Sequence, residues 1–124
     1  MPQRERAFVP VEKLRDYALN PTHPEGRSKA VIFKEMLGIE RRHANVLAEL
    51  IKATLPRAPA RSGSEDKYGQ RWRTYHPIIG LNGREAVVTV AWIFKTQQPD
   101  VPVLISCYIE AQEQEKLRQL LRSE

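Results

Sequence analysis

The sequence predicts an α+β fold in which N-terminal helices pack on an antiparallel sheet of three to four strands, followed by a short C-terminal helix. Two observations support this prediction. Apolar residues recur at helical spacing up to about residue 54, whereas later segments are rich in β-branched and aromatic residues. In addition, Asn82-Gly83 separates two of these later segments, and Asn-Gly is a strong hairpin signal.

Three helices are expected in the first half. The first spans Val11 to Leu19 and ends at Asn20, because a residue that precedes proline is pushed out of the helical region. The second begins behind Ser28 as its N-cap and stops at Gly38. The third runs from about Glu40 to Thr54 and carries an apolar stripe.

The rest of the chain is expected to form a loop, a sheet and a helix. Residues 55–67 hold two prolines, a glycine and small polar or charged residues without periodicity, which predicts a mobile surface loop. The expected segments are a helical part at about 10–54, the loop at 55–67, a sheet at about 68–110 and a C-terminal helix at about 111–122. With 124 residues, the chain is long enough for one core and is expected to be a single domain, 1–124.

The expected hairpin also sorts the side chains between two faces, and a connection of two or of four residues gives the same sorting. One face then carries Trp72, Thr74, His76 and Ile78 with Val87, Thr89, Ala91 and Ile93. The other carries Arg71, Arg73, Tyr75 and Ile79 with Ala86, Val88, Val90, Trp92 and Phe94. The second strand is apolar on both faces, so we expect it at the centre of the sheet.

The composition restricts location and partners. The net charge is +5, which favours a polyanionic partner because Lys and Arg contacts to phosphates release counterions. No apolar run approaches the roughly 20 residues that span a bilayer, and the N-terminal MPQRER leads into no signal-peptide core. We therefore expect a cytoplasmic protein that does not contact membranes. Cys107, the single cysteine, lies in an apolar run and is expected to be buried and inert.

No metal or cofactor is expected. His23, His43 and His76 lie far apart without paired-ligand spacing, and the carboxylates are scattered, whereas zinc and hard cations need clustered ligands. The sequence also has no phosphate-binding glycine loop, nucleophile elbow or dinucleotide fingerprint. If the protein is an enzyme, metal-free acid–base chemistry is the natural candidate.

The segment NPTHPEGRSK, Asn20 to Lys29, gathers two X-Pro steps, a glycine, a histidine and a lysine between two expected helices. Lys29 near a helix N-terminus predicts an anion site, since the free N–H groups and the helix dipole favour negative charge there. His23 could then act as general acid or base. The structural alternative is that Asn20 and His23 only hydrogen-bond the loop backbone, while the prolines and the glycine set its turns.

The expected sheet supplies further candidates. His76, on the face of Thr74 and Thr89, is a second candidate acid or base. Aromatic side chains that could stack on bases are Tyr68, Trp72, Tyr75, Trp92 and Tyr108, with core packing favoured for Trp92. Arg71 and Arg73 alternate beside Tyr75, which fits a phosphate track and equally a solvated edge that resists aggregation.

Four strings carry a resemblance to a known family: KLRDYALNPTHPEGRSKAVIFKEMLG, KYGQRW, LNGREAVVTVAWIF and PVLISCYI. Spanning about Leu14 to Ile109, they resemble an uncharacterised bacterial family of short free-standing proteins. Its domain is also similar to C-terminal modules of polymorphic, contact-dependent toxins. Those modules look like metal-independent ribonucleases of the barnase, EndoU, colicin and RelE type, with N-terminal helices followed by an antiparallel sheet.

The resemblance points to specific residues. They are Tyr17, Asn20, His23, Gly26 and Lys29 from the helical half, and Tyr68, Trp92, Ser106 and Tyr108 from the sheet. The expected catalytic set is His23, Lys29, Ser106 and Tyr108, and the expected substrate contacts are Tyr17, Asn20, Tyr68, Arg71, Arg73 and His76. The chain departs from the family pattern at Val103, where relatives carry arginine, and at Ser106, where they carry threonine.

The leading hypothesis is a metal-independent, toxin-type endoribonuclease that acts on RNA by acid–base chemistry. The alternative is a non-enzymatic module that binds protein or nucleic acid, such as one partner of a two-gene toxin–antitoxin-like system. The candidate partners are therefore RNA and a small cognate antitoxin- or immunity-like protein. The sequence does not indicate an oligomeric state.

Overall fold

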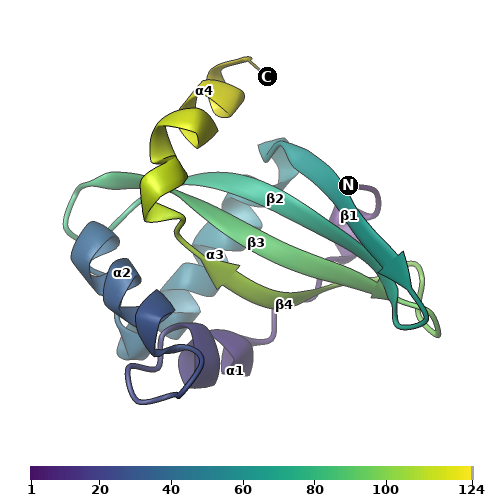
Figure 1. The fold of residues 1–124 in the computed structure, drawn as a ribbon, viewed down its shortest axis with the longest axis horizontal. Coiled ribbons are helices and arrows are strands. Elements are labelled where there is room, and N and C mark those ends of the chain that lie inside the picture. The colour runs from purple at the N-terminus through teal and green to yellow at the C-terminus, as the bar shows by residue number, and fades with distance from the viewer. Residues whose placement is uncertain (124) are drawn as a thin grey trace.

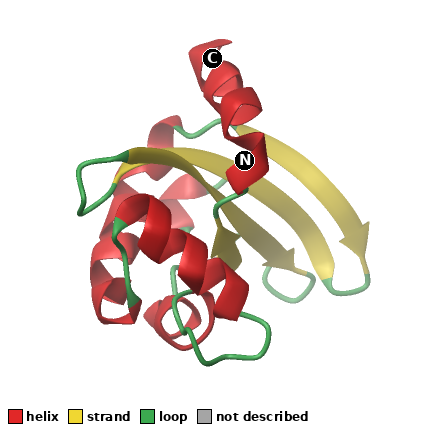
Figure 2. Cartoon of the chain, turned by 60° about the vertical axis from the view of Figure 1, so that its left-hand side comes forward, coloured by secondary structure: helices red, strands yellow, loops and turns green. Residues whose placement is uncertain are grey.

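The computed structural model of the protein describes residues 1–123. Within these residues, helices α1 to α3 gather on one side of a four-stranded antiparallel sheet, and α4 packs against its other face (Figure 1; Figure 2). This arrangement confirms the predicted α+β class. None of the helices in this part of the chain combines the length and apolar character needed to cross a bilayer.

The helices lie close to their predicted positions. Their bounds are α1 Val11–Lys13, continued by a π-helical turn over Leu14–Ala18, then α2 Arg27–Leu37, α3 Ala44–Thr54 and α4 Gln114–Ser123. Short 3-10 turns occupy Arg4–Arg6, Arg41–His43, Leu55–Arg57 and Ala111–Glu113. Gly38 ends α2 in the left-handed conformation (φ 64°), as predicted. Ser28 was wrongly predicted as the N-cap of α2, since Gly26 occupies that position.

The strands follow the order β1-β2-β3-β4. They span Ala60–Asp66, Gly69–Ile79, Glu85–Lys95 and Pro102–Tyr108. The prediction of a mobile loop over residues 55–67 was wrong, because most of this segment is the edge strand β1. Exposed side chains fill this strand after Ala60, so its sequence carries no apolar alternation and its pairing depends on backbone hydrogen bonds to β2.

The register of β2 on β3 also differs from the prediction. Ile79 pairs with Glu85, so the connection is the five residues 80–84 and not two or four. The Gly80 N–H donates to the Arg84 carbonyl at 2.7 Å, and the Gly83 N–H donates to the Gly80 carbonyl at 3.0 Å. An odd connection reverses the pairing of faces, because successive strand residues alternate.

The true register therefore divides the sheet into a helix-covered face, on which α1 to α3 pack, and an opposite face, which α4 covers only in part and which we call the open face. The helix-covered face carries Trp72, Thr74, His76 and Ile78 with Ala86, Val88, Val90 and Trp92. The open face carries Arg71, Arg73 and Tyr75 with Thr89, Ala91 and Ile93. The connection lies against the end of α2, where a Cβ on Gly80 would overlap the backbone of Leu37.

The core lies between the helices and β3. Trp92 is fully buried, which confirms the preference for core packing at this residue, and Phe33 and Leu104 belong to the same cluster. Fully burying an apolar side chain of this kind contributes roughly 1.5–3 kcal/mol. Cys107 is buried as predicted, and burial raises the pKa of its thiol to about 12.

A chain of buried hydrogen bonds crosses this core through His76. The Thr54 hydroxyl donates to the Leu50 carbonyl at 2.8 Å, so it accepts from His76 Nδ1 at 2.6 Å. On the other side of the ring, the Thr74 hydroxyl donates to His76 Nε2 at 2.7 Å and accepts from Trp92 Nε1 at 2.8 Å. Both ring nitrogens are satisfied in the neutral form, and burial, helped by the Arg4 charge, lowers the pKa of His76 to about 3.

This depressed pKa makes the fold sensitive to mild acid. The unfolded chain protonates His76 near its ordinary pKa of 6.5, whereas the folded chain resists protonation down to about pH 3. The stabilising contribution is therefore complete above pH 6.5 and is lost as the pH falls toward 3. We expect the free energy of unfolding to drop by about 1.4 kcal/mol per pH unit over this window.

Urea denaturation at pH 7, 6 and 5 measures this dependence, and NMR of the His76 ring checks its source. The ring signals should report one neutral tautomer, with the proton on Nδ1, down to pH 5. A free energy that is constant between pH 7 and 5, or a ring that titrates near pH 6.5, would contradict the assignment.

Candidate functional site

The loop between α1 and α2 is held by its own polar side chains. Asn20 Oδ1 accepts from the Thr22 N–H at 3.1 Å and from the Thr22 hydroxyl at 2.9 Å, while Asn20 Nδ2 donates to the Asp16 carbonyl at 3.2 Å. The side chain of Asn20 is thus used to shape the turn, in agreement with the structural alternative.

His23 holds the turn that leads into α2. Its Nδ1 accepts from the backbone N–H groups of Glu25 and Gly26, each at 3.0 Å. A nitrogen that accepts two N–H groups carries no proton, so in this conformation the proton is on Nε2. His23 can therefore donate a hydrogen bond from Nε2. The ring could accept a proton only at Nδ1, which would break both hydrogen bonds from the backbone. These bonds fix the turn before α2, whose N-cap residue Gly26 makes no side-chain capping bond.

Gly26 allows the loop to fold back on α1. A Cβ at this position would overlap the carbonyl of Tyr17, so only glycine fits here without a shift of the backbone. The close approach places the rings of Tyr17 and His23 in a stacked pair, with their centroids 4.9 Å apart and an interplanar angle of 23°.

Lys29, in the first turn of α2, joins this loop to the sheet. Its Nζ donates to the Tyr17 hydroxyl at 2.9 Å and to the Ser106 hydroxyl at 3.2 Å. The ammonium also lies 4.4 Å from the ring centroid of Tyr17 and 5.7 Å from that of Tyr108. The ion pairs formed within residues 1–123 do not include Lys29. We call Tyr17, His23, Lys29, Ser106 and Tyr108 the Lys29 cluster.

Strand β4 supplies two members of the cluster from the open face of the sheet. Ser106 pairs with Ala91 and Tyr108 pairs with Thr89, whose hydroxyl donates to Glu110 at 3.0 Å. Partial burial raises the pKa of Tyr108; Glu110 and Tyr75 raise it further, and Arg73 opposes them. At neutral pH the Tyr108 hydroxyl therefore retains its proton and can donate it.

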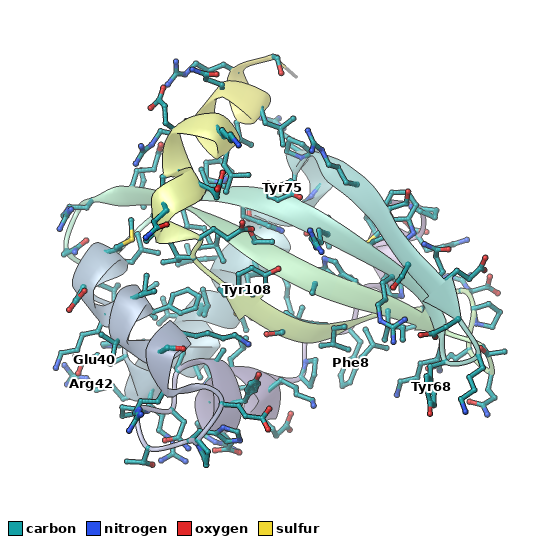
Figure 3. All side chains as sticks on the ribbon, viewed as in Figure 1. Phe8, Glu40, Arg42, Tyr68, Tyr75 and Tyr108 are labelled. Carbon is teal, nitrogen blue, oxygen red and sulfur yellow. The ribbon has the colours of Figure 1, made fainter. Side chains whose placement is uncertain are left out.

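Of the ten site residues predicted from the sequence, the cluster brings together five and leaves the others apart. Tyr68 is 62% exposed at the end of the sheet far from Tyr108 (Figure 3), where Lys67 lies over its ring at 5.2 Å. Arg71 is neutralised by Asp66 at 2.9 Å, and His76 is fully buried within its threonine network. Arg73 shares the open face with Tyr108.

Position 103, where the resemblance leads us to expect arginine, is apolar and structural in this chain. Val103 pairs with Ile93 on β3 and forms a parallel bridge with Phe8. The Phe8 N–H donates to the Pro102 carbonyl at 2.9 Å, and the Leu104 N–H donates to the Phe8 carbonyl at 3.0 Å. The N-terminal segment thus covers part of the outer edge of β4.

Two hollows of the surface lie away from the Lys29 cluster. One of about 400 Å³ is lined by Pro21, Val31 and Arg41 among others, on the side of α2 that faces Glu40. Another, of about 560 Å³, lies at the end of the sheet beside Trp72 and Phe94. Because Ser106 and Tyr108 are on the open sheet face, their surroundings suit an extended ligand better than a small molecule held in a pocket.

Comparisons with known proteins agree with this architecture. A chain of a solved structure, described as a contact-dependent growth inhibition toxin–immunity protein complex from Klebsiella pneumoniae 342, matches with a TM-score of 0.60 and 16% identity. The match covers 86% of this chain and 96% of that chain, and at such low identity it shows a shared fold. A family model described as a domain of unknown function, DUF6883, matches residues 1–111, so the chain belongs to that family. No curated protein matches the chain.

Gly26→Ala tests whether the close loop packing positions the cluster. The added methyl group collides with the Tyr17 carbonyl, so we expect the backbone to shift and the free energy of unfolding to fall by about 1–3 kcal/mol. Thermal unfolding followed by circular dichroism measures the loss. Gly63→Ala is the matched control, because its Cβ meets Arg71 only at ordinary contact distances from 3.5 Å. Equal melting temperatures for the two variants would contradict the packing.

Proposed function

We propose that the protein is a toxin-type domain that binds RNA at the Lys29 cluster and cleaves it without a metal ion. The observation that carries the proposal is the setting of the Lys29 ammonium, which hydroxyl groups and aromatic rings hold and which forms no ion pair with a carboxylate of residues 1–123. A phosphodiester oxygen would supply the missing negative charge. The fold that the chain shares with part of a toxin–immunity complex supports a place in such a system, as toxin or as partner.

The hydrogen-bonding capacity of the cluster matches a phosphate group. An ammonium has three N–H donors, and the hydroxyls of Tyr17 and Ser106 accept two of them. Because each hydroxyl accepts from Lys29, its own proton is available for a phosphate oxygen. Donors that already point toward a developing negative charge lower the barrier, since they need no reorganisation during the reaction.

In this proposal the 2′-oxygen of the ribose attacks the neighbouring phosphorus while the bond from phosphorus to the 5′-oxygen breaks. Lys29, Tyr17 and Ser106 stabilise the charge on the phosphate oxygens. Tyr108 donates its proton to the leaving 5′-oxygen, since its raised pKa keeps that proton at neutral pH. His23 donates a hydrogen bond from Nε2 to the phosphate, and the proton of the 2′-hydroxyl passes to water.

The second candidate is a module that binds without cleaving. It is favoured by the state of His23, whose Nδ1 is occupied by two backbone N–H groups and whose Nε2 is protonated. Within the Lys29 cluster as described, neither His23 nor Tyr108 is ready to accept a proton. In that case the cluster holds RNA, or an acidic group of an antitoxin- or immunity-like protein, as a binding site only.

Cleavage of total tRNA by the purified protein in EDTA distinguishes the candidates. We expect Lys29→Ala to lower the rate by about 100-fold or more, the loss typical of removing one donor to a developing oxyanion. Tyr108→Phe should lower the rate with unchanged tRNA affinity, because it removes only the transferable proton. His23→Ala should weaken both binding and rate.

Lys34→Ala is the matched control, since Lys34 is on the same helix, is 69% exposed and faces Glu40 at 3.8 Å. Its rate should stay within twofold of the unmodified protein. Equal cleavage by the unmodified protein and by Lys29→Ala would refute the catalytic assignment. Binding of tRNA with no cleavage by any variant would establish the second candidate.

A further inference from the structure

We propose that a single RNA strand crosses the open face of the sheet along one cross-strand row, from Arg61 on β1 through Arg73 and Ala91 to Ser106 on β4. The inference rests on the proposed RNA site at the Lys29 cluster and extends it to a defined path. We call Arg61, Arg73, Ala91 and Ser106, together with Lys29, the basic row.

The strand pairings place the β-strand members of the basic row directly opposite one another. Arg61 pairs with Arg73, Arg73 pairs with Ala91, and Ala91 pairs with Ser106. Residues paired across strands point to the same face, and neighbouring strands are about 4.8 Å apart, so the row extends about 14 Å across the sheet. It ends at the Lys29 ammonium, which is bound to Ser106.

Within residues 1–123, the charges of the basic row form no ion pair. The ion pairs formed by residues 1–123 include neither Arg61, Arg73 nor Lys29, although Arg71 next to them is paired with Asp66. Arg61 and Arg73 are also directly opposite each other, and like charges in that position are destabilising. A polyanion along the row would relieve this repulsion.

A bulge in β1 exchanges the faces of its two acidic side chains. The register shifts between Ser62 and Glu65, so Glu65 pairs with Gln70. Gln70 pairs with Phe94 and belongs to the same face as Trp72, which is the helix-covered side. The same shift pairs Asp66 with Gly69 and so brings Asp66 to the open face, where its carboxylate is bound by Arg71 at 2.9 Å and not by the basic row.

The neighbouring row indicates a single nucleic-acid strand and not an acidic protein. Tyr75 pairs with Thr89, and Thr89 pairs with Tyr108, so two tyrosines lie beside the basic row (Figure 3). Tyr75 is 5% exposed, whereas Tyr108 is only partly buried and offers its ring to a base. A line of cations beside an aromatic ring is the arrangement that binds single strands, with phosphates on the cations and bases stacked.

The test measures binding of a fluorescent 2′-O-methyl RNA decamer, which the protein cannot cleave, by anisotropy over a range of salt concentrations. We expect Arg61→Ala and Arg73→Ala each to weaken binding several-fold and to reduce the salt slope by about 0.7, the value for one lost phosphate contact on a single strand. Arg84→Ala, in the exposed β2–β3 connection, is the control and should bind as the unmodified protein does.

The substitution Arg61→Glu is expected to change thermal stability and RNA affinity in opposite directions. It places a carboxylate opposite Arg73, so we expect a higher melting temperature together with at least tenfold weaker RNA binding. Unchanged affinity in the Arg61 and Arg73 variants would overturn the path, and so would a lower melting temperature for Arg61→Glu. Equal displacement of the probe by poly-L-glutamate of matched charge would identify a surface for acidic proteins and would also overturn it.

Failure of the inference is distinguishable from failure of the proposed function. If the Arg variants lose binding while tRNA is never cleaved, the path stands and the catalytic assignment falls. If Lys29→Ala abolishes cleavage while the Arg variants bind normally, the catalytic assignment stands and the path falls.

Discussion

The pairing of β2 with β3 is the constraint on which the rest of the structure depends. With Trp72 opposite Trp92, every large apolar residue of β3 from Val88 to Trp92 on that face meets the helices. A slip of one residue would turn Trp92 and Val90 outward and bring Thr89 and Ala91 into the core, at about 1.5–3 kcal/mol for each large side chain. The connection at Gly80, docked on Leu37, holds the register at one end.

The same register creates the open face and decides what lies on it. Because Ala91 points outward, Arg73 and Ser106 lie on either side of a small side chain, and Lys29 can reach Ser106 from the edge of β4. Lys29 in turn ties the helical half to the sheet, since it contacts Tyr17 as well. One side chain thus links two parts of the fold and also carries the charge on which the proposed function depends. Such sites commonly retain unfavourable features, such as the facing arginines, at the expense of stability.

Elements with their own local signal were predictable, and those that depend on a distant partner were not. The helix stop at Gly38 and the burial of Trp92 and Cys107 followed from residue type and spacing. Strand β1 was missed because its exposed residues have no apolar alternation, so only β2 makes it a strand. The N-cap of α2 was misplaced by two residues, because the helix begins behind Gly26, which makes no side-chain capping bond and so carries no capping signal in the sequence. For the β2–β3 hairpin, the predicted pairing of faces was the reverse of the observed one. The connection has an odd number of residues, and its length is set by contact with α2.

For the candidate site, the sequence by itself determined which reactive and charged side chains are available and marked one unusual local segment. The segment from Asn20 to Lys29 was recognisable as unusual, and the resemblance connected it with Ser106 and Tyr108. Only the tertiary structure decided that Lys29 binds Ser106, that the ring of His23 is held as a donor, and that His76 is part of the core. It also brought Arg61 opposite Arg73, from a segment that was expected to be a loop. The physical reason is that residue types and spacing encode local conformation, whereas side chains distant in sequence meet only through strand register and helix packing.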